Sequence, residues 1–258
     1  MARSRRGRGP SFLVRRVLSR IRSGSSSPLL VETDAGRFVA KLRGAAQGPS
    51  ALVAEVVVAD LAELLGLPVP ERVSLELEAD VTKDDRNDEL ADLLAASVGQ
   101  NLGFRWLPGA SVLRATDAAT MDDEFAVRVL WLDGLVLNPD RTPSNPNVLL
   151  SKGQPWLIDH GAALTFQYDW ARVSEDSPRE AARHGPHLFD ARRPLLARYD
   201  EALARVLSRE ALVEVLAGVP DSFLADRPAE WSPARARAAY VAFLWKRLRA
   251  PRPFASGE

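Results

Sequence analysis

Two adjoining stretches decide the fold: "VLNPDRTPSNPNVLL", from Val136 to Leu150, and "WLIDHGAAL", from Trp156 to Leu164. The first places Asp140 and Asn145 five residues apart in a proline-rich turn. The second ends an apolar run with Asp159, where a carboxylate without a metal or cationic partner would be costly. A turn needs only turn-forming residues. Carboxylates and an amide at these positions therefore indicate a functional loop followed by a β-hairpin.

Composition favours a globular chain with one large domain or two small lobes. The 258 residues are 46% hydrophobic and 26% charged, and the formal net charge is zero. No overall charge therefore favours a nucleic acid or a membrane as partner. Cysteine is absent, which excludes disulfides and thiolate metal sites. No apolar run approaches the roughly 18 residues of a transmembrane helix, and we expect a cytoplasmic protein.

The first 22 residues form a distinct basic segment, with eight arginines and no acidic residue. We predict a basic tail followed by a short amphipathic helix. Its inner face would consist of Phe12, Leu13, Val14, Val17, Leu18 and Ile21. The alternative is an arm that binds nucleic acid or a phosphorylated partner, and we favour the helix.

The following residues, 23–108, are predicted to form a small lobe. A small-residue loop, "SGSSSP", precedes two alternating runs, "LLVET" and "RFVAKL", which predict a β-hairpin. Helical periodicity then covers residues 49–66. A strand, a helix over 90–98 and an extended segment follow. The break at Pro108-Gly109 is the expected boundary of this lobe.

Residues 109–258 are predicted to form a mainly helical second lobe. A helix over 121–137 has apolar residues at helical spacing and must end before Pro139. The loop and hairpin quoted above come next. From residue 178 onward we expect helices, interrupted at Pro220.

In this order the chain carries the parts that phosphoryl transfer requires. Lys41 ends a strand, Glu55 lies on the next helix, and Asp140, Asn145 and Asp159 follow. On these residues the chain resembles the protein-kinase-like superfamily, most closely the HipA-like kinases of bacteria, and "DRTPSN" also resembles the loop of lipid kinases. The resemblance covers about residues 23–164. It implies an α+β, two-lobed protein-kinase-like fold with a small β-rich N-lobe and a mainly helical C-lobe.

The resemblance also implies a role for each residue. Lys41 would contact the α- and β-phosphates of ATP, with Glu55 as its partner, and Asp140 would be the catalytic base. Asn145 and Asp159 would bind Mg²⁺. Three serines would cover the phosphates in place of a glycine-rich loop: Ser25, Ser26 and Ser27.

The chain departs from the protein-kinase pattern around these residues. No His-Arg pair precedes Asp140; Arg141 follows it, and either helps neutralise the transferred phosphate or braces the loop. "DHG" replaces "DFG", and we interpret His160 as a hydrogen-bonded structural histidine. Asn147 is either a second metal ligand or, as we favour, a turn residue. We interpret the other histidines as loop residues: His184 and His187.

Four functions are open on these observations. We favour an ATP- and Mg²⁺-dependent HipA-like kinase whose acceptor is a serine or threonine hydroxyl of a protein. The second is a phosphotransferase acting on a small molecule or a lipid head group. The third is a nucleotide-binding pseudokinase scaffold, against which the intact set of residues argues. The fourth is a nucleic-acid-binding protein that uses its basic N-terminal segment.

Overall fold

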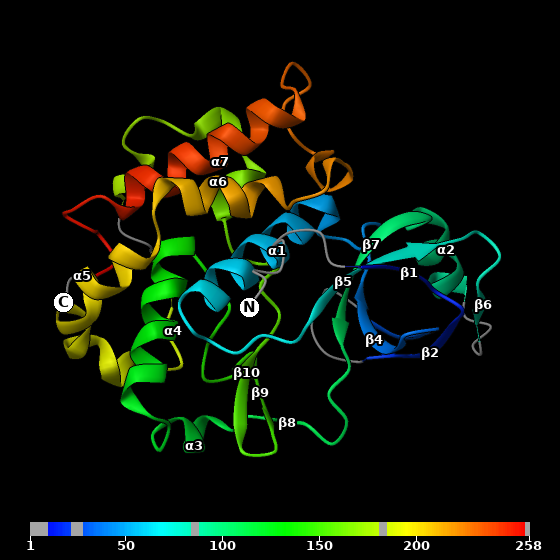
Figure 1. Ribbon diagram of the computed structural model, residues 1–258, viewed down its shortest axis with the longest axis horizontal. Coiled ribbons are helices and arrows are strands. Elements are labelled where there is room, and N and C mark those ends of the chain that lie inside the picture. The colour runs from blue at the N-terminus through cyan, green and yellow to red at the C-terminus, as the bar shows by residue number, and fades with distance from the viewer. Residues whose placement is uncertain (1–9, 22–27, 84–87, 181–184, 256–258) are drawn as a thin grey trace, which may run out of the picture.

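The computed structural model describes residues 10–21, 28–83, 88–180 and 185–255. Figure 1 shows a curled β-rich part, built from N-terminal residues, beside a helical part built mainly from C-terminal ones. This confirms the expected α+β fold with a β-rich N-terminal sheet and a helical C-terminal part. None of the described helices is long and apolar enough to cross a membrane.

The β-rich part is a seven-stranded sheet with strand order β1-β5-β7-β4-β3-β2-β6. The predicted hairpin is present, because β3 and β4 are antiparallel and Thr33 pairs with Gly36 across the turn. Gly36 has a φ of 110°, which suits glycine. The elements are β1 (Ser11–Leu13), β2 (Arg16–Arg20), β3 (Leu29–Thr33), β4 (Gly36–Lys41), β5 (Arg72–Leu77), β6 (Thr82–Lys83), α2 (Asp88–Ala96) and β7 (Gly99–Arg105).

The prediction of an N-terminal helix is wrong, because residues 11–13 and 16–20 are strands. β1 runs parallel to β5, and β2 runs antiparallel to β3. Val14 and Val17 have helical spacing, but both side chains are buried in the core of the sheet. Strand edges offer backbone partners for every second residue, and this pairing outweighed the local periodicity. Three arginines of the segment are ion-paired within the protein: Arg15 with Asp34, Arg16 with Glu32 and Arg20 with Glu89.

The helical part contains the predicted helix over 121–137 as α4 (Asp123–Val136). Asp122 caps α4 by accepting a hydrogen bond from the backbone N–H of Phe125. The remaining helices are α3 (Ala115–Ala118), α5 (Leu196–Val206), α6 (Arg209–Ala217) and α7 (Pro233–Leu248), with short 3₁₀ turns that include η1 (Thr165–Tyr168), η2 (Trp170–Arg172), η3 (Ser177–Arg179), η4 (Asp190–Leu195) and η5 (Asp221–Leu224). A three-stranded sheet of order β10-β9-β8 carries the predicted second hairpin: β8 (Ser111–Val112), β9 (Val148–Ser151) and β10 (Gln154–Leu157).

Helix α1 (Gly48–Leu64) packs mainly with the helical part, in a cluster that also includes Leu102 and Phe104 of β7. The described residues form two hydrophobic clusters. The smaller lies within the sheet and includes Val31 and Phe38. The larger contains the buried residues of α1 together with those of α4 and the C-terminal helices, and Figure 1 shows α1 beside those helices. The strand that carries Lys41 contributes Phe38 and Ala40 to the smaller cluster, while Val39 of the same strand packs against the larger cluster, to which the helix that carries Glu55 belongs.

Candidate active site

The ammonium group of Lys41, at the end of β4, lies between two carboxylates. Its Nζ is 3.0 Å from Oε1 of Glu55 and 2.5 Å from Oδ1 of Asp159. We call these three residues the Lys41 cluster. Burial lowers the pKa of Lys41, but the charges of Glu55 and Asp159 outweigh burial and raise it above its ordinary value. The lysine is therefore a cation in this site at neutral pH.

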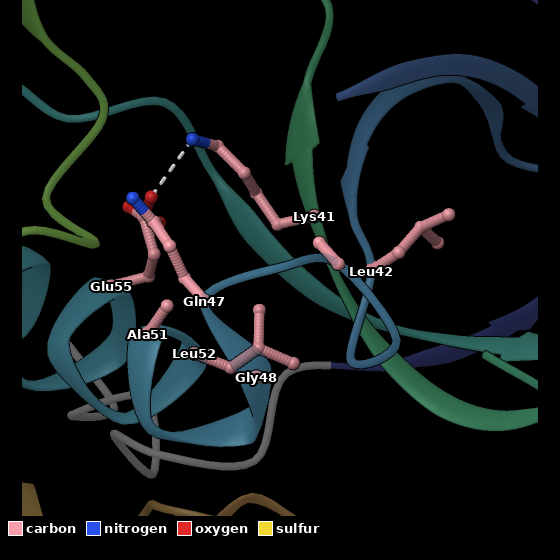
Figure 2. A pocket seen from close by; sticks show the side chains of 8 residues that line it. Lys41, Leu42, Gln47, Gly48, Ala51, Leu52 and Glu55 are labelled. Atoms are coloured by element: carbon pink, nitrogen blue, oxygen red, sulfur yellow. Dashed lines mark ion pairs between the residues drawn. The ribbon is translucent and has the colours of Figure 1, made fainter. Parts of the chain in front are cut away.

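Glu55 connects Lys41 to the "DHG" segment. Its Oε2 accepts a hydrogen bond from the backbone N–H of His160 at 3.0 Å. Burial raises the pKa of Glu55; Lys41 opposes this effect and Asp159 adds to it, so the pKa lies above its usual value. Figure 2 shows Lys41 and Glu55 pointing toward one another beside a pocket. The pocket is lined by Lys41, Leu42, Ala45, Gln47, Gly48, Ala51, Leu52 and Glu55.

Asp159 comes two residues after the end of β10, with a left-handed φ of 54°, a conformation that aspartate adopts more readily than most residues. Its cationic partner is Lys41. This ion pair offsets the free-energy cost that we expected for a carboxylate at the end of an apolar run. The Asp159 side chain is 26% exposed. The Lys41 cluster thus holds one ammonium and two carboxylates, and this excess of negative charge favours a further cation.

The loop that carries Asp140 is fixed by side-chain amides on both sides. The backbone N–H of Asp140 donates to Oδ1 of Asn138 at 3.1 Å. The Nδ2 of Asn147 donates to the backbone oxygen and to Oδ2 of Asp140, both at 3.2 Å. The carboxylate of Asp140 is therefore held in one orientation at a partly exposed position.

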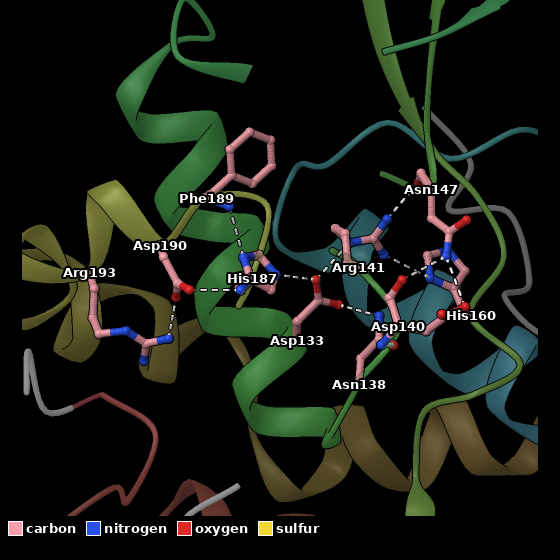
Figure 3. A network of polar contacts seen from close by, with 10 residues as sticks. All are labelled: Asp133, Asn138, Asp140, Arg141, Asn147, His160, His187, Phe189, Asp190 and Arg193. Carbon is pink, nitrogen blue, oxygen red and sulfur yellow. Dashed lines mark hydrogen bonds and ion pairs between the residues drawn. The ribbon is translucent and has the colours of Figure 1, made fainter. Parts of the chain in front are cut away.

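A second group of charged residues lies beneath this loop (Figure 3). Oδ2 of Asp133, in α4, accepts hydrogen bonds from Nε of Arg141 at 2.6 Å and Nε2 of His187 at 2.9 Å. Its Oδ1 accepts from Nδ2 of Asn138 at 2.8 Å. We call these four residues the Asp133 cluster. Burial alone would raise the pKa of Asp133. Arg141 and His187 lower it by a larger amount, so the pKa of Asp133 lies well below its usual value.

Arg141 braces the loop, which was one of the two roles expected for it. Its Nη1 donates to the backbone oxygen of Asn147 at 2.5 Å, and its Nη2 lies 3.4 Å from Nδ1 of His160. His160 is fully buried. Burial and the charge of Arg141 lower the pKa of His160 well below its ordinary value, and the contact with Arg141 fits the interpretation of His160 as a hydrogen-bonded structural histidine.

The sequence interpretation missed Asp133 and treated His187 as a loop residue. Because Nδ1 of His187 accepts from the backbone N–H of Phe189, its Nε2 carries the proton that it donates to Asp133. One signal was available: Asp133 interrupts the apolar run "VLWLDGLVL", and a carboxylate inside a buried helix requires partners. No sequence pattern identified those partners.

The two asparagines of the loop differ in their surroundings. Asn145, the predicted metal ligand, is exposed in the turn, and its backbone N–H bonds to Thr142. Asn147 is buried and directly precedes β9. Its backbone oxygen accepts from the N–H of Ile158, the residue before Asp159. Asn147 therefore lies beside Asp140 and at the same end of the hairpin as Asp159.

Within the described residues, no group of three or more His, Asp or Glu side chains is placed to hold a metal ion. Mg²⁺ in phosphoryl-transfer sites is bound by one or two protein carboxylates, with phosphate oxygens and water completing the shell. The oxygens of Asp159 and Asn147 have the chemistry that Mg²⁺ prefers. The other predicted residues of the site, Ser25, Ser26 and Ser27, lie outside the described residues, as does His184.

Comparisons with known proteins identify the family of the chain. A search of curated proteins finds no match. Among solved structures, the chain is similar to the Helicobacter pylori proinflammatory kinase CtkA, with a TM-score of 0.48 and 12% identity over 92% of each chain. A family model described as "HipA-like kinase" matches residues 14–250. The chain therefore belongs to the HipA-like kinase family.

Proposed function

We propose that this chain is an active kinase that transfers the γ-phosphoryl group of ATP to a hydroxyl group, with serine or threonine of a protein as the acceptor. The observation that carries the proposal is the position of Lys41, whose ammonium is held by Glu55 and Asp159. A compact ammonium at a strand end is suited to phosphate oxygens. Membership of a kinase family implies the use of ATP.

In the proposed reaction, the acceptor oxygen forms a bond to the γ-phosphorus, and the bond from that phosphorus to the bridging oxygen of ADP breaks. The proton of the acceptor hydroxyl passes to Asp140. The hydrogen bonds from Asn138 and Asn147 support this role, because they fix the loop and the orientation of the carboxylate. A positioned general base contributes roughly 10²–10⁴-fold to the rate.

We assign the Mg²⁺ ligands to Asp159 and Asn147, in place of the pair Asp159 and Asn145 that the five-residue spacing predicts. Nδ2 of Asn147 is used by Asp140, so its Oδ1 is the atom left to bind a metal. When bound, Mg²⁺ would neutralise phosphate charge and orient the phosphates. Lys41 would then share its charge between the phosphates and Glu55.

The proposal is tested by comparing Asp140→Asn with Asp159→Asn. MgATP should raise the melting temperature of the wild type, since ligand at 100 times its dissociation constant stabilises by about 2.7 kcal/mol. Asp140→Asn should keep that shift and lose turnover, because the base acts only as the hydroxyl attacks. Asp159→Asn should lose both, because a metal ligand is missing before the reaction begins.

Turnover is followed with ATP labelled in the γ-phosphate, incubated with Mg²⁺ and a cell lysate. Phosphatase inhibitors are present in every reaction, so that transferred label is retained. Label that enters protein with the wild type and not with Asp140→Asn supports a protein acceptor. Label recovered in the small-molecule or lipid fraction would reassign the acceptor class. If MgATP at millimolar concentration fails to shift the melting temperature of the wild type, the proposed function is rejected.

A further inference from the structure

Helix α1 is capped by a residue from a distant part of the chain. Gln47, the residue before the helix, forms no side-chain cap. Instead, Oδ2 of Asp226 accepts hydrogen bonds from the backbone N–H of Ser50 at 3.2 Å and from its hydroxyl at 3.0 Å. The first N–H groups of a helix have no intrahelical partner. A carboxylate at that end satisfies one of them and interacts favourably with the helix dipole.

The start of α1 is shaped around this carboxylate. Gly48 has a left-handed φ of 67°, and a Cβ at this position would lie 3.1 Å from Oδ2 of Asp226. Asp226 follows η5, a segment that packs directly against α1. The contact therefore joins the C-terminal helical part to the beginning of the helix that carries Glu55.

The capped end of α1 also borders the "DHG" segment. A Cβ on Gly161 would lie 3.4 Å from Oε1 of Glu55 and 3.5 Å from the Cβ of Ala51. Glu55 is five residues after Ser50, and it contacts both Lys41 and the backbone of His160. A displacement of the first two turns of α1 would therefore change the distances from Glu55 to both partners.

We infer that Asp226 is a positioning residue for the phosphate site: by capping α1 through Ser50, it holds Glu55 within reach of Lys41. This inference rests on the proposed function, because its consequence is tighter binding of MgATP. Asp226 is exposed, so its removal leaves no buried charge without a partner. A variant at this position should keep the fold.

The test is a double-mutant cycle on the dissociation constant of MgATP, measured by titration calorimetry below the melting temperature of every variant. Asp226→Ala should weaken binding about fivefold in the wild-type background, within the range for residues coupled through one network. In the Glu55→Gln background, Asp226→Ala should cause no further weakening. Asp226→Asn, which keeps an acceptor oxygen, should restore most of the affinity.

A matched control is Asp221→Ala. Asp221 is an exposed acidic residue of the same segment, but it pairs with Arg237 of α7, so its loss should leave the dissociation constant unchanged. Equal weakening by Asp226→Ala in both backgrounds, or by Asp221→Ala, would overturn the positioning role, and so would wild-type affinity in Asp226→Ala. Failure of the wild type to bind MgATP is a different result, because it rejects the proposed function itself.

Discussion

The Asp133 cluster and the Lys41 cluster are both buried groups of charges, but they differ in balance. In the first, one carboxylate is matched by the guanidinium of Arg141 and by neutral donors from His187 and Asn138. In the second, two carboxylates share the single ammonium of Lys41. The first cluster is electrostatically complete, whereas the second carries an excess of negative charge.

This difference in charge indicates that the Asp133 cluster supports the fold and that the Lys41 cluster is suited to binding a ligand. The Asp133 cluster lies beneath the loop, and Arg141 is almost fully buried within it. Its members have partners in the protein, which favours rigidity. The Lys41 cluster joins two hydrophobic cores, and its Asp159 is partly exposed. We therefore expect mutations in the first cluster to reduce the stability of the fold, and mutations in the second to reduce ligand binding.

The largest expected effect is that of Asp133→Ala on stability. The substitution leaves the buried guanidinium of Arg141 without its carboxylate, and breaking a buried pair in this way costs about 3–5 kcal/mol. Urea unfolding followed by circular dichroism measures the loss. Asp133→Asn keeps an acceptor oxygen, so its free energy of unfolding should decrease less. If the alanine variant does not fold, the asparagine variant should still fold and can be measured in its place.

The matched control for this prediction is Asp117→Ala, which breaks the exposed pair between Arg114 and Asp117. Exposed pairs contribute little, so the free energy of unfolding should not change within error. If Asp133→Ala unfolds at the same urea concentration as this control, the Asp133 cluster does not support the loop.

The two clusters should also respond to pH with opposite signs. The pKa of Asp133 is lowered in the folded state, so its contribution to stability is present above its unfolded value near 3.8 and is lost as the pH falls below it. The pKa of Glu55 is raised, so the folded state binds a proton more readily than the unfolded chain. Glu55 therefore reduces stability as the pH rises above about 4.5.

Melting temperatures of the apo protein between about pH 3 and pH 7 test both signs. In Asp133→Asn, the melting temperature should fall less steeply than in the wild type as the pH is lowered below about 3.8. In Glu55→Gln, it should fall less steeply than in the wild type as the pH rises above 4.5. If both variants alter the pH dependence of the melting temperature on the same side of the pH range, the two clusters do not differ as described.

Local patterns predicted much of this molecule. Alternation predicted the β3–β4 hairpin, helical spacing predicted α1 and α4, and motif order identified Glu55 as the partner of Lys41. The N-terminal strands were missed because the spacing of Val14 and Val17 fits a helix until β3 and β5 supply partners. Periodicity describes one element, and it contains nothing about which neighbour is available.

The supporting residues were missed for a related reason. Asp133 and His187 are 54 positions apart, and Ser50 and Asp226 are 176 apart. Each of these residues has an ordinary local explanation as a helix, loop or turn residue. Their contacts arise only when the C-terminal helices pack against α1 and α4, so a single sequence read by local rules does not reveal them.

The smallest expected effect concerns Asn147, which contacts both the Asp133 cluster and the proposed base Asp140. Its backbone oxygen is held by Arg141, while its side chain faces Asp140. Asn147→Gly removes the amide but suits the left-handed φ of 48°, so the fold should be retained. We expect the tightening of ATP binding by Mg²⁺ to be roughly tenfold smaller than in the wild type, which corresponds to about 1.4 kcal/mol. Titrations of Mg²⁺ at fixed ATP measure it. Asn145→Ala is the matched control and should bind as the wild type does. The reverse result, weakening by Asn145→Ala alone, would return the ligand to the position that the five-residue spacing predicts and would leave Asn147 with only a structural role, through its contacts with Arg141 and Asp140.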